Sequence, residues 1–456
     1  YPTCCSGSLL LRALAEASNP RVSICGQEKD SSTAALAKLN MLLHGVSNAE
    51  IKVGDTLGNP QFTQYGMLST FDVCVANPPF SQKNWLASDM LPDQYNRWTA
   101  NLLPPAKCGD YAFLLHLISS MKADVGRGAC ILPHGVLFRG NAEYDIRKDI
   151  IEKHYIKGII GLPPNIFFGT GIPASIIIID KKNKDCRKGI FVIDAKDGFT
   201  KDGAKNRLRE QDIKHIVDAW DAQQTIPHYC RLVEWSEIEK NDYNLNISRY
   251  IQPIDSEIQH DIEAHLHGGL PATDVENMEI FWKACPTLKE KLFCGANNGY
   301  YSLMPKKEDI NDVIDSDSSY KAQGEAFAKV LNGWKEDVEP KMMAINQGVH
   351  PKELIADWSE SLLAKTMEHS GLVDAYDTYD VLLNYWADAM QDDCYMISND
   401  GWTYPEVKAI KVKEVKEKKN KKDNGSDTES NKSKTKEMSE YESEVNGYLA
   451  EMGFTL

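Results

Sequence analysis

The sequence predicts an α/β fold, a doubly wound sheet wrapped by helices, followed by a mostly helical region. Two observations carry this prediction. Over the first 250 residues, short apolar runs alternate with helical patterns, which is typical of a parallel sheet with crossover helices. Beyond about residue 254 the isoleucine-rich runs stop, and tryptophans recur at helical spacing. A length of 456 residues suggests two or three domains.

The helices expected in the first region are identified by apolar residues at helical spacing and by candidate capping residues. Leu36, Leu39 and Leu43 mark one face of the second helix, and Asp110 is placed to cap the third. The expected helices cover residues 9–17, 32–44, 111–121 and 141–152.

The strands expected in the first region are short apolar runs of the length of buried strands. We expect them to lie in one sheet of at least seven strands. They cover residues 21–26, 51–53, 71–76, 128–132, 156–162, 174–180 and 190–194.

Three further segments follow the first domain, which is expected at residues 1–253. Residues 254–405 are expected to form the helical region, with its tryptophans in the core rather than in a ligand site. Residues 408–436 hold eleven lysines and few apolar residues, so we expect 406–440 to be a disordered lysine-rich linker. DNA contact by these lysines is the alternative to a solvated linker. Residues 441–456 are expected to be a short helical tail.

Composition limits the classes of function. No apolar run approaches the roughly 20 residues of a membrane span, and no signal peptide is visible, so no membrane partner is expected. Eleven cysteines without a CxxC pair indicate reduced thiols, a cytoplasmic location and no metal site. His44, His116 and His134 lack ligand spacing and are expected to be structural. With a net charge of −15, a nucleic-acid ligand would need a local basic surface or, as we favour, a partner subunit.

Asn77-Pro78-Pro79-Phe80 ends the apolar run of residues 71–76 and carries the clearest chemistry. The Asn77 amide oxygen and the Pro78 carbonyl can accept both hydrogens of an exocyclic amine, leaving its lone pair free to attack without a general base. The prolines fix φ, and the Phe80 ring offers a face to a flipped base. An ordinary strand-ending turn is the alternative. The turn resembles the signature of amino methyltransferases, which transfer methyl groups from S-adenosylmethionine, so all four residues are candidate catalytic residues.

The cofactor would lie at the carboxyl ends of the strands. Glu28 follows the strand expected at residues 21–26 and can bind ribose hydroxyls, with an exposed surface glutamate as the alternative. Asp55 can accept a hydrogen bond from the adenine amine, with an Asp-led turn as the alternative. Asp110 and Phe113 are expected to face either the methionine end of the cofactor or the target base. The alternative is that they only cap a helix and pack in the core. The residues expected at the cofactor are Thr3, Ser6, Gly7, Ser8, Glu28 and Asp55.

Over most of residues 1–295, the chain resembles the modification (methyltransferase) subunit of Type I restriction–modification systems. The resemblance implies a Rossmann-like fold and S-adenosylmethionine-dependent methylation of adenine N6 in DNA. It also implies assembly of two such subunits with one specificity subunit, joined by a restriction subunit. Besides Asn-Pro-Pro-Phe, the matching stretches are residues 26–28, 39–41, 44–45, 54–57, 132–140, 146–148, 162–167, 169–173 and 244–250.

Two departures from the family pattern bear on activity. Tyr1 stands where the family has an aspartate for the cofactor's ammonium, and Cys5 stands at a glycine position, which would force an unfavourable φ. The chain is also expected to lack the family's N-terminal helical domain and first strand, which would expose apolar edges and weaken cofactor binding. A catalytically impaired assembly subunit is therefore one alternative. An amino methyltransferase acting on RNA or protein glutamine is another, which the long family stretches disfavour.

Overall fold

The computed structural model describes residues 1–17, 21–87, 90–99, 102–252, 261–369 and 371–402. Within these ranges the chain forms two compact units, one of residues 1–334 with 359–384 and one of residues 335–358 with 385–402. None of the described helices has both the length and the apolar character needed to cross a bilayer. The domain boundary expected at residue 253 stays a prediction, and the lysine-rich linker and the helical tail lie outside the described residues.

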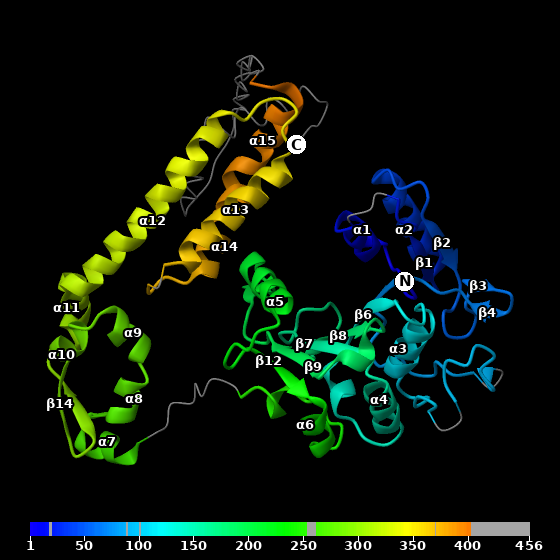
Figure 1. Cartoon of the computed structure of the whole chain (residues 1–456), viewed down its shortest axis with the longest axis horizontal. Coiled ribbons are helices and arrows are strands. Elements are labelled where there is room, and N and C mark those ends of the chain that lie inside the picture. Colours follow the sequence, from blue (N-terminus) through cyan, green and yellow to red (C-terminus); the bar gives the residue numbers. More distant parts are fainter. Residues whose placement is uncertain (18–20, 88–89, 100–101, 253–260, 370, 403–456) are drawn as a thin grey trace, which may run out of the picture. The chain divides into compact units, whose positions relative to one another are not determined.

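A six-stranded sheet lies within residues 73–234, in the order β12-β9-β7-β8-β6-β5. Figure 1 labels all of these strands except β5. All of the strands of this sheet except β12 were predicted, within a few residues at each end. The strands are β5 (Val73–Ala76), β6 (Arg127–Pro133), β7 (Ile156–Gly161), β8 (Ala174–Asp180), β9 (Gly189–Asp194) and β12 (Cys230–Glu234).

The sheet is mixed, and the expectation of a wholly parallel sheet is wrong. β5 pairs with β6 and β7 pairs with β9 in parallel, whereas β8 is antiparallel to both of its neighbours and β12 is antiparallel to β9. β8 follows β7 through a loop without a helix, and a parallel return would need a crossover connection. The isoleucines of β8 are buried in either arrangement, so their pattern could not report direction.

β1 (Cys25–Glu28) and β2 (Glu50–Val53) form a separate parallel pair, so the expected single sheet of at least seven strands is wrong. The first residues of the chain lie along β1: Gln27 N–H donates to the Tyr1 carbonyl (2.9 Å), and Cys4 N–H donates to the Gln27 carbonyl (2.9 Å). Toward β5, the Tyr1 hydroxyl accepts from Asn77 N–H (3.1 Å), and the Thr3 hydroxyl donates to the Asn77 carbonyl (3.3 Å). Side chains therefore connect the pair to the sheet in place of a backbone ladder.

Helices cover both faces of the six-stranded sheet, as in a doubly wound fold. Ile159 packs in the core shared with α3 and α4, and its neighbour Ile160 packs in the core shared with α5, because successive strand residues point to opposite faces. The helices of this region are α1 (Ser8–Ala15), α2 (Ser31–Leu43), α3 (Asp110–Ser119), α4 (Ala142–Glu152), α5 (Glu210–Ala222) and α6 (Trp235–Lys240).

A third core, the smallest of these three, lies beneath the β1–β2 pair. It contains seven buried residues, Cys4, Leu10, Ile24, Ala34, Ala37, Met41 and Ile51, against thirty-two in the largest core cluster. The predicted face of Leu36, Leu39 and Leu43 on α2 is exposed, so these leucines do not contribute to that core. Two short hairpins complete the region: β3 (Thr63–Gln64) with β4 (Met67–Leu68), and β10 (Thr200–Asp202) with β11 (Lys205–Arg207).

The region after residue 260 is mostly helical, as predicted, but it includes a three-stranded antiparallel sheet that was not predicted. Trp358 and Trp386 are buried with their ring centroids 6.0 Å apart, which confirms a core role for these two tryptophans. The strands are β13 (Leu270–Pro271), β14 (Phe293–Asn297) and β15 (Tyr300–Leu303). The helices are α7 (Ile262–His267), α8 (Ala272–Glu276), α9 (Glu279–Ala284), α10 (Leu288–Leu292), α11 (Ile310–Ser316), α12 (Ser318–Met343), α13 (Pro351–Met367), α14 (Ala375–Tyr385) and α15 (Gln391–Asp400).

Candidate active site

A cavity of about 1070 Å³ lies at the carboxyl ends of β1, β2 and β5. Its wall brings together most of the predicted site residues, which are far apart in the sequence. The predicted residues that line it are Thr3, Glu28, Asp55, Asn77, Pro78, Pro79, Phe80 and Phe113. Ser6, Gly7 and Ser8 do not line it, and their assignment to a cofactor stays a prediction.

The Asn77 turn presents free acceptors to the cavity. The backbone of Asn77 is held from both sides, by the Tyr1 hydroxyl and the Thr3 hydroxyl. Within the described ranges, no group hydrogen-bonds the Asn77 side-chain amide or the Pro78 carbonyl. Both acceptors remain available to a ligand that brings a pair of N–H donors.

Ser81, the residue after Phe80, is fixed by a buried carboxylate. Ser81 N–H donates to one oxygen of Asp110 (2.6 Å), and the Arg139 guanidinium donates to the other (2.9 Å). The N-cap of α3 is Gly109, so the expectation that Asp110 caps this helix is wrong. Its carboxylate instead positions the end of the Asn-Pro-Pro-Phe turn, which a helical pattern alone could not reveal.

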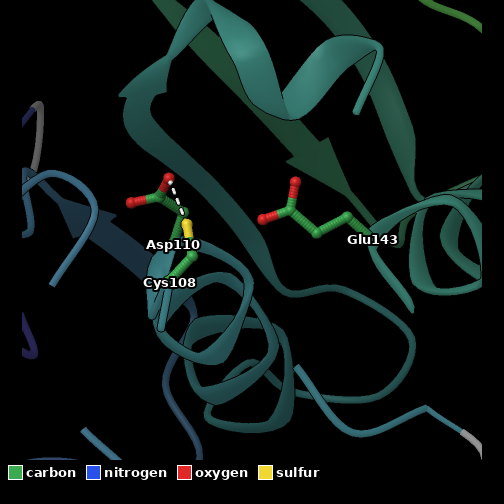
Figure 2. Close-up of side chains that lie close together, drawn as sticks. All are labelled: Cys108, Asp110 and Glu143. Carbon is green, nitrogen blue, oxygen red and sulfur yellow. Dashed lines mark hydrogen bonds between the residues drawn. The ribbon is translucent and has the colours of Figure 1, made fainter. Parts of the chain in front are cut away.

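Cys108, Asp110 and Glu143 lie close enough to be considered a metal site (Figure 2). However, the Arg139 guanidinium donates to all three, to Cys108 Sγ at 3.2 Å and to Glu143 Oε1 at 3.3 Å besides Asp110. A cation is therefore already supplied by the chain, and the cluster is an ion-pair network. Burial raises the pKa of Glu143, although the charge of Arg139 opposes this effect.

Aromatic rings form the side of the cavity beyond Asn77. Phe80 and Phe167 meet edge to face with ring centroids 5.7 Å apart, and Phe113 and Phe168 also line the wall. No role was predicted from the sequence for Phe167 or Phe168. Their place in the sequence could have predicted this role. Both residues follow β7, whose carboxyl end lies at the same edge of the sheet as that of β5.

The loop at the other end of the cavity contains the two departures from the family pattern. Cys5 has a φ of 47°, which confirms that a side chain here requires the left-handed conformation. Its N–H donates to Glu28 Oε2 at 2.9 Å. Burial raises the pKa of the Tyr1 hydroxyl, so Tyr1 is a neutral group where a carboxylate was expected.

Glu28 and Asp55 are both held by backbone N–H groups. Glu28 accepts from Cys5, from Lys29 (2.9 Å) and from Asp30 (3.2 Å). Asp55 leads a turn, accepting from Leu57 N–H (3.0 Å), and pairs with the Lys29 ammonium (2.7 Å). Partial burial opposes ionisation of Asp55, but the Lys29 hydrogen bond and the turn N–H groups lower its pKa overall. An ionised carboxylate accepts about four hydrogen bonds, so each retains capacity for a ligand.

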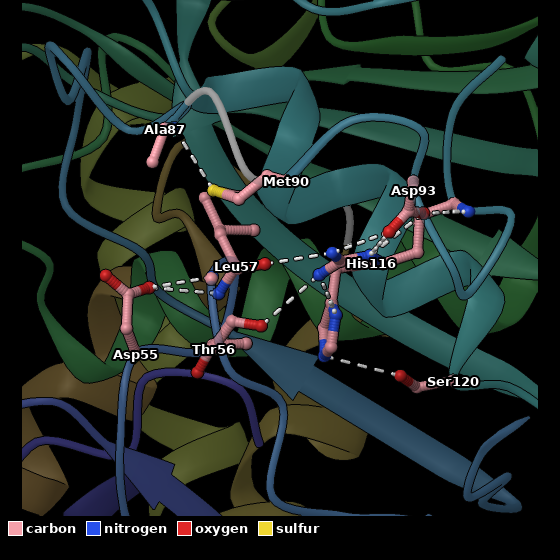
Figure 3. A network of polar contacts seen from close by, with 10 residues as sticks. Asp55, Thr56, Leu57, Ala87, Met90, Asp93, His116 and Ser120 are labelled. Carbon is pink, nitrogen blue, oxygen red and sulfur yellow. Dashed lines mark hydrogen bonds and ion pairs between the residues drawn. The ribbon is translucent and has the colours of Figure 1, made fainter. Parts of the chain in front are cut away.

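Arg97 joins the Asp55 turn to the segment after Asn-Pro-Pro-Phe. Its guanidinium donates to the carbonyls of Thr56 (3.3 Å) and Leu57 (2.9 Å) and pairs with Asp93 at 2.8 Å. Figure 3 labels three of its partners, Thr56, Leu57 and Asp93, together with His116 on α3. Burial and the charge of Arg97 lower the pKa of His116 to about 3, so this histidine is neutral, in agreement with the predicted structural role.

Comparison with known proteins identifies relatives of this chain. Residues 1–259 match the family model described as N-6 DNA Methylase. The Type I restriction enzyme MjaVII methylase subunit of Methanocaldococcus jannaschii is 34% identical over 280 residues, 58% of this chain and 47% of that protein. The Type I restriction enzyme MpnII methylase subunit of Mycoplasma pneumoniae is 31% identical over 260 residues, 54% and 47% of the two chains.

A solved structure is also similar to this chain. The type I restriction-modification system methyltransferase subunit from Streptococcus thermophilus is 41% identical, with a TM-score of 0.51 over 55% of this chain and 53% of that one. The chain thus spans about half the length of the relatives it matches.

Proposed function

The chain belongs to the N-6 DNA methylase family, and from this premise we propose that its cavity transfers methyl groups from S-adenosylmethionine to adenine N6 in DNA. One observation supports this most directly. The acceptors of Asn77 and Pro78, which have no partner among the residues that the structure describes, line one cavity with two carboxylates of spare capacity, Glu28 and Asp55. Its 1070 Å³ slightly exceeds the roughly 300–1,000 Å³ of small-molecule pockets, leaving room for a cofactor and a base.

The residues present fit such a cofactor. Glu28 and Asp55 would hold its hydroxyl and amine donors, and the Asn77 end of the cavity would face its reactive group. S-adenosylmethionine, when bound, supplies an electrophilic methyl group. We propose that Tyr1 and Cys5 weaken the binding, because no carboxylate stands at Tyr1 and Cys5 holds a strained conformation.

The chain's own contribution to the reaction is orientation. The Asn77 amide oxygen and the Pro78 carbonyl accept the two hydrogens of the target amine, which turns its lone pair away from them. Phe80, braced by Phe167, supplies the surface for the base, which must first leave the duplex stack at a cost of a few kcal/mol. Preset acceptors cost no reorganisation during the reaction, which is the general origin of such catalysis.

The proposal extends to partners and location. We propose that the chain works on DNA beside a specificity subunit, a restriction subunit and a second modification subunit, in the cytoplasm. The net charge of −15 supports delegation of DNA recognition to another chain. The location is proposed from the eleven cysteines, which form no CxxC pair in the sequence.

Asn77→Ala tests the proposal. S-adenosylmethionine affinity would be measured by calorimetry, and labelled methyl transfer would be measured on unmethylated plasmid DNA with the specificity subunit co-expressed. We expect transfer to fall by at least about 100-fold with cofactor affinity within about threefold, since loss of one preorganised group costs this much. Asn48→Ala, exposed and outside the cavity wall, is the control and should leave both quantities unchanged.

Other outcomes would contradict the proposal. An equal loss of cofactor affinity and transfer in Asn77→Ala would overturn the role of Asn77. Methylation of RNA or of a glutamine peptide in place of DNA would support the alternative amino methyltransferase. Absence of cofactor binding, restored by Tyr1→Asp with Cys5→Gly, would leave assembly as the function of the chain.

A further inference from the structure

Lys205 on β11 fastens the loop of residues 163–173, which carries part of the aromatic wall. Its ammonium donates to Asn165 Oδ1 (3.0 Å), to the Phe167 carbonyl (2.7 Å) and to the Thr170 carbonyl (3.0 Å). An ammonium has three protons, so all of its donors are directed at this one loop.

The rest of the β10–β11 hairpin reinforces the attachment. The Asn165 amide donates to the Ala204 carbonyl (2.6 Å), and Asn206 N–H donates to the Asn165 carbonyl (3.1 Å). The Asn206 amide donates to the Pro164 carbonyl (2.7 Å). These bonds secure the beginning of the loop, whereas the bonds of Lys205 also reach its middle, at Phe167 and Thr170.

The middle of the loop has few interactions of its own. Residues 164–165 and 168–169 form turns, but within the described ranges no backbone N–H from Ile166 to Gly171 makes a well-aligned hydrogen bond to another backbone group. Phe168 is 94% exposed, and Gly169 has a φ of 78° with open space around it. Without the ammonium, the position of this segment would depend mainly on the contact between Phe167 and Phe80.

We propose that Lys205 is a positioning residue for the target nucleotide. By holding the Phe167 and Thr170 carbonyls, it keeps Phe167 against Phe80, so that the aromatic side of the cavity is formed before the base arrives. Lys205 does not itself line the cavity. This inference rests on the proposed function and adds to it a residue remote from the Asn-Pro-Pro-Phe turn.

The structural part of the inference is tested without DNA or cofactor. Chymotrypsin cleaves after exposed phenylalanines, and cleavage requires the segment to leave its folded position. We expect Lys205→Met to raise the rate of cleavage after Phe167 and Phe168 about tenfold, the effect of losing bonds worth about 1.4 kcal/mol. Lys205→Arg should fall between wild type and Lys205→Met, because it retains charged donors.

Lys201→Met is the matched control. Lys201 lies on the same hairpin, and its ammonium lies 5.7 Å from the Phe199 ring rather than at the loop. This variant should be cleaved at the wild-type rate. A wild-type cleavage rate for Lys205→Met would overturn the inference, as would equal acceleration by Lys201→Met.

Kinetics test the functional part. With the specificity subunit present, we expect Lys205→Met to raise KM for plasmid DNA about tenfold while its Kd for S-adenosylmethionine stays within about twofold. A general loss of structure would change both the KM for DNA and the Kd for S-adenosylmethionine. Lys205→Arg should have a KM between those of wild type and Lys205→Met. An unchanged KM in an active protein would overturn the positioning role alone. Absence of transfer by the unchanged chain would overturn the proposed function and this role together.

Discussion

Arg97 joins the Asp55 turn to the segment after Asn-Pro-Pro-Phe through one buried side chain. It holds the carbonyls that follow Asp55 and pairs with Asp93, with both side chains only 2% exposed. We expect Arg97→Met to lower the free energy of unfolding by about 3–5 kcal/mol, because Asp93 would be left charged and unpaired. Urea denaturation measures this change, and calorimetry should show weaker S-adenosylmethionine binding.

Two further variants separate charge from geometry at this position. Arg97→Lys keeps the charge but lacks the planar set of donors that reaches both carbonyls, so it should also lose cofactor affinity. Adding Asp93→Asn to Arg97→Met should recover part of the stability, since no buried charge remains. An unfolding free energy of Arg97→Met within about 1 kcal/mol of wild type would contradict the assigned role.

At the residue scale, the sequence allowed prediction of the side chains that follow strands. Glu28, Asp55 and Asn77 all lie on the cavity because the carboxyl ends of these strands meet at one edge. Arg97 and Lys205 were not predicted, because each acts on a segment about 40 residues away in the sequence. No local pattern records such a contact.

At the scale of elements, α4 carries the carboxyl group of Glu143, whose charged form is disfavoured by burial. Glu143 Oε2 is buried and has no partner among the described residues, and burial raises the pKa of this group. A raised pKa means that the folded state binds the proton more tightly than the unfolded state. The contribution of Glu143 to stability is therefore present below its unfolded pKa and is lost as pH rises through its folded pKa.

Glu143→Gln should remove this pH dependence. We expect the variant to gain stability relative to wild type as the pH is raised from 4 to 8, because its amide remains neutral. Denaturation of both proteins across this range measures the difference, and the direction of the change is the prediction. A difference that is constant with pH, or that favours wild type as the pH rises, would contradict it. Glu152→Gln, on the exposed face of the same helix, serves as the control.

The positions of the strands were easier to predict than the strands with which they pair. The seven expected strands all exist, yet they belong to two sheets, and one of them runs opposite to expectation. Burial selects the same apolar residues whichever neighbour a strand has, so β8 carried no information on direction. β12 was missed because its five residues alternate buried and more exposed positions weakly.

At the scale of the whole molecule, the charge of −15 opposes binding to a polyanion. We expect the chain alone to bind a 30-base-pair duplex more weakly than about 10 μM at 150 mM salt, within the range of non-specific association. Fluorescence anisotropy measures this, and addition of the proposed specificity subunit should tighten binding. Submicromolar binding by the chain alone would contradict the prediction and would show that its own lysines grip DNA.

The overall architecture was predictable because the alternation of apolar runs and helices extends over 250 residues. The three-stranded sheet after residue 260 was not predicted, because its strands are two to five residues long and leave no clear periodicity. The family model matches only residues 1–259. The later helices therefore had to be predicted from local patterns.

The separate core under β1 and β2 has a consequence for how the protein opens. Because this core has only seven buried residues and, in the part of the chain that the structure describes, no backbone ladder to the main sheet, we expect α1, α2, β1 and β2 to open as one foldon, with a lower opening free energy than the six-stranded sheet. Glu28 lies on this foldon, so a cofactor bound there would stabilise it selectively by mass action. Amide hydrogen exchange in β1 and β2 would then report occupancy of the site, whereas exchange in β7 and β8 would report only global unfolding.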